Sequence, residues 1–323
     1  MITRRQISDA HSLIAPHLRL TPIIDVSGMS PLPLTLKLEV FQHTGSFKPR
    51  GAFNNLLSLD RPSAGVAAAS GGNHGAAVAY AAAQLQSKAR IFVPLTTPPA
   101  KLALIRAEGA DIVQKGGNYA EAFDLCRRYV EETGALLVHA YDSALTIAGQ
   151  GTLALELERQ APDLDTILVA VGGGGLIAGV AAWYSSGLKI VSVEPENCPT
   201  LERALSHSGP VDIAPSGVAA DSLGASRIGA LPFSLAKSYV DRALLVADSD
   251  IRRAQAWLWN NLRLIAEPGG ATAFAAITSG AYRPGPQERV GIVVCGANTD
   301  LASFAEAAGL DALTPAEAFA PSP

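Results

Sequence analysis

Lys48 has the surroundings of a lysine that reacts. It follows the turn residues Thr44-Gly45-Ser46 and precedes Pro49, which suits the first position of a helix and disfavours helical backbone at Lys48 itself. Phe47 and Phe53 flank the amine, and burial beside such rings lowers a lysine pKa. The segment therefore indicates an amine that forms a Schiff base near neutral pH, the alternative being a solvated surface lysine.

Four consecutive glycines, Gly172-Gly173-Gly174-Gly175, follow an apolar run at 167–171 and precede a helix that begins near Leu176. Glycines allow close approach to an anion, and the N–H groups at a helix start favour negative charge. The spacing of the glycines differs from the dinucleotide-binding G-x-G-x-x-G pattern. Glu194 is therefore a poor candidate for the acidic residue that binds the ribose in such sites. We predict a phosphate cradle, with a turn that binds nothing as the alternative.

A second loop, Ser70-Gly71-Gly72-Asn73-His74-Gly75, also opens a helix after a strand. Its hydroxyl, amide and backbone N–H groups suit a carboxylate, although a capped helix start with no ligand has the same pattern. We assign His74 a positional role only.

Cys295 ends a third strand, at 289–295, and is followed by Gly296-Ala297-Asn298-Thr299-Asp300. A lone buried cysteine is most often inert packing, but an amine, a phosphate cradle and a carboxylate loop elsewhere in the chain favour a role at the same site. The other two cysteines, Cys126 and Cys198, lie far away in sequence, which argues against zinc and redox pairs and favours a reducing compartment.

These loops must be positioned by alternating strands and helices, the pattern of a parallel sheet with crossover helices. One series of βα units covers residues 65–139 and a second covers 146–295, while 209–232 reads as irregular. Two such blocks imply a cleft between them, with ligands outside the carboxyl ends of the strands. The predicted helices are 51–57, 74–85, 99–108, 119–132, 146–159, 176–184, 251–262 and 271–279, and the predicted strands are 65–69, 89–93, 110–113, 136–139, 166–171, 189–194, 243–246 and 289–295.

The chain has 323 residues, is 48% apolar and carries a formal charge of −4 with both signs interspersed. This composition argues against a nucleic-acid surface and against a polybasic membrane contact. The N-terminus has no apolar signal core, and the uncharged stretch 167–184 is interrupted by the four glycines. We expect a cytoplasmic enzyme that acts on a small molecule.

The three motifs around Lys48, Asn73 and Gly172 together resemble the threonine/serine dehydratase and serine racemase group of pyridoxal-phosphate enzymes. This group shares fold type II with the β-subunit of tryptophan synthase, and the resemblance runs in order over about residues 15–300. It implies an α/β fold with two open, twisted, mostly parallel sheets flanked by helices. Pyridoxal 5'-phosphate would lie in the cleft between a large domain, 1–55 and 143–323, and a small domain, 56–142.

The resemblance also implies residue roles. Lys48 resembles the lysine that holds the cofactor as a Schiff base, Phe47 its neighbour on the ring, and Cys295 the group against the pyridine nitrogen. Asn73 resembles the residue that binds the 3-hydroxyl and, with Ser70, Gly71, Gly72 and His74, the loop that grips the substrate carboxylate. The phosphate cup is Gly172, Gly173, Gly174, Gly175 and the N–H of Leu176.

The thiol of Cys295 indicates the reaction type, because a thiol holds a proton on the ring nitrogen poorly and leaves the ring a weak electron sink. We therefore expect β-elimination of water from a β-hydroxy amino acid such as serine or threonine, with Lys48 removing the α-proton. Racemases of the group carry a serine at the position of Gly71, which argues against racemisation. A β-replacement enzyme of cysteine-synthase type, a racemase-like enzyme and a cofactor-bound sensor without turnover are the alternatives.

The resemblance leaves other features open. Metal-binding members use a Glu and an Asp six residues later, where this chain has Glu194 and Thr200, so we predict no metal. Arg128, Ser222 and Glu267 are possible contacts of the site or ordinary capping and ion-pair residues. About 15 residues follow a last helix expected near Ala308, which suggests no regulatory domain, and homodimerisation is expected from the family alone.

Overall fold

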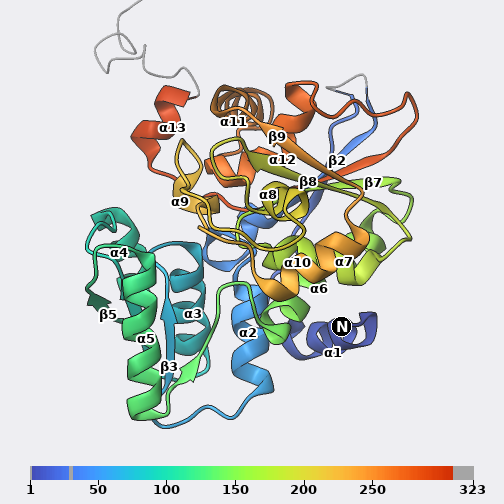
Figure 1. The fold of residues 1–323 in the computed structure, drawn as a ribbon. Helices are drawn as coiled ribbons and strands as arrows, with labels where there is room; N and C mark the ends of the chain where they lie inside the picture. The colour runs from blue at the N-terminus through green and yellow to red at the C-terminus, as the bar shows by residue number, and fades with distance from the viewer. Residues whose placement is uncertain (1, 29–31, 308–323) are drawn as a thin grey trace, which may run out of the picture.

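The computed structural model describes residues 2–28 and 32–307, and two β-sheets organise them (Figure 1). The larger sheet has the strand order β1-β2-β10-β7-β8-β9, and only β1 runs antiparallel to its neighbour. The smaller sheet has the order β5-β4-β3-β6 and is parallel throughout. The expected α/β fold of two mostly parallel sheets is confirmed.

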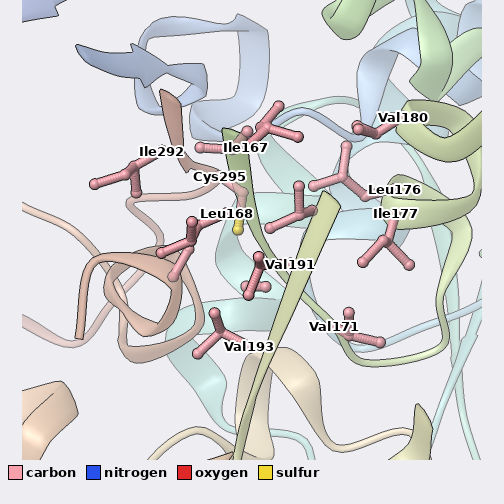
Figure 2. Close-up of a cluster of buried hydrophobic side chains, with 14 of the residues drawn as sticks. Ile167, Leu168, Val171, Leu176, Ile177, Val180, Val191, Val193, Ile292 and Cys295 are labelled. Carbon is pink, nitrogen blue, oxygen red and sulfur yellow. The ribbon is translucent and has the colours of Figure 1, made fainter. Parts of the chain in front are cut away.

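The strands of the larger sheet read as continuous apolar runs because helices cover both of its faces. All five residues of β7 and of β10 are buried. Helices α11 and α12 lie on one side and α6, α7 and α10 on the other (Figure 1). Figure 2 shows Leu168, Val191 and Val193 among the buried side chains around the central strands.

The strands of this sheet are β1 (Ile23–Asp25), β2 (Leu34–Leu38), β7 (Thr166–Ala170), β8 (Lys189–Pro195), β9 (Arg242–Val246) and β10 (Val290–Val294). Its helices are α1 (Arg4–Ile14), α6 (Ala144–Gln160), α7 (Gly175–Tyr184), α8 (Thr200–Ser206), α9 (Ala220–Leu223), α10 (Ala230–Tyr239), α11 (Asp248–Leu262), α12 (Pro268–Thr278) and α13 (Leu301–Ala307).

Successive residues of the smaller sheet face different helices, as the two-residue period of a strand requires. Val66 and Ile91 pack with α2 and α3, whereas Ala67 and Phe92 pack with Cys126 of α5. The sheet consists of β3 (Val66–Ala69), β4 (Ala89–Val93), β5 (Asp111–Gln114) and β6 (Leu136–Leu137). The helices around it are α2 (Pro49–Ser58), α3 (Asn73–Gln84), α4 (Pro99–Ala107) and α5 (Tyr119–Thr133).

The structure adds elements that the sequence pattern did not indicate. Helix α1, the short strands β1 and β2, and helices α8 and α10 were not predicted, and three 3-10 turns cover Ala15–His17, Glu39–Phe41 and His43–Gly45. Helix α13 lies where a last helix was expected. Part of the segment expected to be irregular, 209–232, forms α9 and the start of α10. In the part of the chain that the structure describes, we find no helix with the length and apolarity needed to cross a bilayer.

Candidate active site

Lys48 lies immediately before α2, with Pro49 in the first helical position as expected. The expectation of non-helical backbone at Lys48 is wrong, because its φ is −59° and its ψ is −32°. Contacts with a distant loop outweigh the local effect of the proline. Phe47 N–H donates to Cys295 O at 3.2 Å, and Ser46 forms an isolated β-bridge with Gly296. These contacts attach the lysine to the carboxyl end of β10.

Lys48 is half-buried, and its amine has few polar neighbours. Its Nζ donates to Ala140 O at 3.3 Å, and the Phe47 ring centroid lies 5.0 Å away. Burial lowers the pKa of Lys48 to about 8, partly opposed by the negative charges that Cys295 and Glu267 would carry. About one tenth of this amine is therefore neutral at pH 7, and able to react with a carbonyl, against less than about one thousandth for an ordinary lysine.

The glycine loop joins the end of β7 to the start of α7. Gly174 has φ +89°, a conformation that a side chain would strain. A Cβ on Gly173 would lie 2.2 Å from the ring of Tyr141, so that position also requires glycine. The loop borders a cavity of about 50 Å³ whose other walls include Lys48 and Cys295. The loop thus presents the N-terminus of a ten-residue helix to a small buried space beside the amine.

The loop Ser70-Gly71-Gly72-Asn73-His74-Gly75, which we call the carboxylate loop, lies at the start of α3. Gly72 N–H donates to Ser70 Oγ at 3.2 Å, and Gly71 leaves no room for a side chain because a Cβ there would lie 2.7 Å from Thr97. His74 Nε2 donates to Val138 O at 2.9 Å, and burial lowers the pKa of His74 to about 3. A neutral, hydrogen-bonded imidazole supports the positional role assigned to His74.

The amide of Asn73 is held from both sides. Its Nδ2 donates to Glu267 Oε1 at 2.6 Å, and its Oδ1 accepts from Asn298 Nδ2 at 2.8 Å. Asn298 Nδ2 also donates to Thr44 O at 2.7 Å, in the turn before Lys48. Burial raises the pKa of Glu267 to about 7, opposed by the hydrogen bond from Asn73. Sequence reasoning missed Asn298, although its place in the loop after β10, three residues beyond Cys295, was a usable signal.

Cys295 follows β10 and is buried, with its Sγ 3.5 Å from Gly269 O. Figure 2 shows its sulfur near the side chains of the central strands. Burial raises the pKa of the thiol well above its usual value, so the group is neutral at physiological pH.

A second cavity, of about 310 Å³, extends outward from Lys48 between the two sheets. The carboxylate loop, Tyr141, Gly173 and residues 220–226 border it. Ser222 lines both cavities and its Oγ accepts from Gly269 N–H at 3.0 Å, so it is part of the site. Arg128 is exposed on α5 and lines neither cavity; its inclusion among possible contacts is wrong because it lies on the solvent face of that helix.

Comparison with known proteins identifies the group to which these features belong. The family model described as "Pyridoxal-phosphate dependent enzyme" matches residues 14–296. The chain belongs to this family.

Individual relatives differ in activity. The pyridoxal-phosphate-dependent chain is 39% identical over 300 residues to a phenylserine dehydratase of Ralstonia pickettii, covering 90% of this chain and 92% of that one. It is 35% identical over 309 residues to an L-threonine ammonia-lyase of Thermotoga maritima, covering 93% and 77%. Maize serine racemase superposes with a TM-score of 0.89 at 32% identity, covering 96% and 97%. These similarities confirm the resemblance to the dehydratase and racemase group.

The residues of this pyridoxal-phosphate-dependent enzyme fit the cofactor. An ammonium group has three donors, yet Lys48 Nζ has one acceptor among the described residues, as suits an amine that is bonded to a ligand. The glycine loop, the helix N-terminus and the neutral thiol border the same small cavity. This cavity is lined by Lys48, Asn73, Cys295 and the loop from Gly172 to Leu176, and the assignment of these residues to pyridoxal phosphate stays a prediction.

The carboxylate of Glu194 is engaged by its own chain. Its oxygens accept from Leu201 N–H at 2.7 Å and Glu202 N–H at 2.8 Å, at the start of α8. Thr200 Oγ1 lies 3.0 Å from Glu194 Oε1 and donates to Gly172 O at 2.5 Å. Thr200 thus connects Glu194 to the glycine loop. The expectation that no metal binds here stays a prediction.

Proposed function

We propose that this enzyme eliminates water from a β-hydroxy amino acid and yields a 2-oxo acid and ammonia. The observation that carries the proposal is a buried, neutral thiol, Cys295, on the wall of the cavity that holds the Lys48 amine. A neutral thiol gives weak support to a positive charge on a ring nitrogen, which disfavours a long-lived carbanion and favours prompt loss of a β-substituent. The elimination breaks the Cα–H and Cβ–O bonds, and hydrolysis of the resulting enamine releases ammonia.

Each residue of the site has its own role in the proposed reaction. When bound, pyridoxal phosphate supplies an aldehyde that reacts with amines and a ring that takes up electron density from the α-carbon. Lys48 accepts the α-proton at Nζ, because its lowered pKa of about 8 leaves part of the amine unprotonated near neutral pH. The Ser70 hydroxyl and the N–H groups of Gly71, Asn73 and His74 hold the substrate carboxylate at the start of α3. The N–H groups of Ser70 and Gly72 support the loop itself, because they donate to Phe92 O and Ser70 Oγ. Glu267 and Asn298 hold the Asn73 amide in one orientation for the cofactor.

Racemisation is the second candidate, because a serine racemase is among the similar structures. It requires a proton donor on the face opposite Lys48, and Gly71 offers no side chain. The space beside Gly71 is filled by Thr97. Elimination, for which Lys48 alone handles the α-proton, is therefore the better supported activity. The cytoplasmic location, expected from the sequence, and homodimerisation, expected from the family, remain expectations.

The test uses purified holoenzyme with L-serine and with L-threonine. We expect 2-oxo acid and ammonia in equal amounts without an added thiol, and no D-serine by chiral chromatography. A requirement for thiol would show β-replacement, and D-serine as the main product would show racemisation. Bound cofactor with no 2-oxo acid from any β-hydroxy amino acid would favour a sensor.

Two lysine variants assign the catalytic amine. Lys48→Ala should abolish turnover and the absorbance at about 410 nm that is typical of Schiff bases of this cofactor. Lys115→Ala is the matched control because Lys115 is exposed and borders neither cavity. Turnover retained in Lys48→Ala would refute the assignment.

A further inference from the structure

Four aromatic side chains form one continuous layer beside the larger cavity. Tyr119 stacks on Phe123 with ring centroids 6.0 Å apart, Phe123 meets His139 edge-on at 5.5 Å, and His139 meets Tyr141 edge-on at 4.9 Å. We call these four residues the aromatic layer. Tyr119 and Tyr141, at its two ends, line the cavity. Since Tyr119 is 40% exposed, its ring has surface that a ligand can cover.

The position of Tyr119 is fixed by local chemistry. It is the first residue of α5, whose N-cap Asn118 accepts from Glu121 N–H at 3.0 Å. Tyr141 is fixed at the other end, because its N–H donates to His139 Nδ1 at 3.3 Å. The layer therefore offers two rings that are already held in place, which lowers the entropic cost of binding a third ring.

The cavity has room for a ring in addition to the reacting part of an amino acid. Its volume is about 310 Å³. A cavity of about 150 Å³ is enough for a benzene molecule. The methyl group of a threonine would leave most of the outer part of this space to water.

The charges at the cavity are already compensated. Lys101 Nζ lies 3.2 Å from Asp221 Oδ1, so the cation and the anion that border the mouth neutralise each other. Burial lowers the pKa of His139, which keeps this ring uncharged near pH 7. A charged β-substituent would find no free partner at this mouth among the described residues, whereas an uncharged ring would find the aromatic layer.

We infer that the preferred substrate carries an aromatic ring on its β-carbon, and that Tyr119 determines this preference by edge or stacking contact with that ring. The inference rests on the proposed elimination and narrows it to 3-aryl-3-hydroxy amino acids. Tyr119 lies outside the small cavity that Lys48, the glycine loop and Cys295 share, so it affects the substrate without holding the cofactor.

The experiment compares L-threo-3-phenylserine with L-threonine on the holoenzyme, with phenylpyruvate and 2-oxobutanoate as products. We expect kcat/KM for phenylserine to exceed that for threonine by about tenfold or more, the effect of one good aromatic contact. Tyr119→Ala should lower kcat/KM for phenylserine by about tenfold, mainly through KM, and change that for threonine by less than about threefold. Tyr119→Phe keeps the ring and should retain the preference.

The possible outcomes separate this inference from the proposed function. Turnover of threonine with equal or slower turnover of phenylserine would overturn the aromatic preference and leave the elimination intact. Equal losses for both substrates in Tyr119→Ala, with unchanged cofactor absorbance and melting temperature, would overturn the role of Tyr119. No 2-oxo acid from either substrate would refute the elimination, and with it the preference.

Discussion

Replacing Arg50 by lysine removes the centre of a buried charge cluster two residues after Lys48. The five N–H donors of Arg50 make five hydrogen bonds. Two go to Glu39 at 2.8 and 2.7 Å, two to Glu156 at 2.8 Å each, and one to Thr152 at 3.1 Å. The Arg50 and Glu39 side chains are fully buried, and that of Glu156 is 5% exposed.

The geometry sets the size of the effect. A lysine has three donors on one atom and cannot bind two carboxylates side-on at once. At least two charge-assisted hydrogen bonds are lost, each worth about 1.5 to 3 kcal/mol. Some compensation remains, because Lys37 still pairs with Glu156 at 2.9 Å and Thr21 still donates to Glu39 at 2.5 Å. We expect Arg50→Lys to lower the free energy of unfolding by about 3 kcal/mol, and Arg50→Met by about 5 kcal/mol, since it leaves two buried carboxylates with less positive charge.

Urea unfolding of the apoprotein, followed by circular dichroism, measures this loss. Arg4→Lys is the matched control: Arg4 pairs with Glu158 at 2.9 Å, but the two side chains are 50% and 37% exposed. An exposed pair contributes at most about 1 kcal/mol. A loss below about 1 kcal/mol in Arg50→Lys, equal to that in Arg4→Lys, would refute the conclusion that the buried cluster stabilises the start of α2.

Three further predictions concern the site. Burial raises the pKa of Glu267 from 4.5 to about 7, so the folded apoprotein binds this proton more tightly than the unfolded chain and loses stability as pH rises from about 4.5 to 7. Glu267→Gln should flatten the pH dependence of the urea midpoint in that window and raise the midpoint at pH 8; an unchanged profile would contradict the assignment. Thr200→Val removes the 2.5 Å hydrogen bond to Gly172 O, and we expect the cofactor dissociation constant, measured by absorbance titration, to rise about tenfold, the equivalent of one hydrogen bond. An unchanged constant would show that Thr200 does not hold the loop. Gly173→Ala places a Cβ 2.2 Å from the Tyr141 ring. We expect this clash to lower the free energy of unfolding, measured by thermal unfolding, by about 1 to 3 kcal/mol and to reduce cofactor occupancy. Full occupancy would show that Tyr141 moves aside without cost.

Local chemistry made several features readable from the sequence. Pro49 in the first position of a helix, the helix that begins after the four glycines and the apolar strands β7 and β10 all depend on the backbone and side chains of a few neighbouring residues. The motifs around Lys48, Asn73 and Gly172 indicated the family for the same reason, since each is a short segment whose residue types carry its chemistry. The family match over residues 14–296 confirms that conclusion.

Only the tertiary structure decided which distant residues meet. Asn298 holds an amide 225 residues away, Glu267 holds the same amide from another loop, and Arg128 faces solvent although its segment lies beside the site. The helical backbone at Lys48 also came from contacts with the loop after β10, against the local preference set by proline. Such contacts depend on how whole sheets and helices pack, and no short segment contains the residues on both sides of a contact.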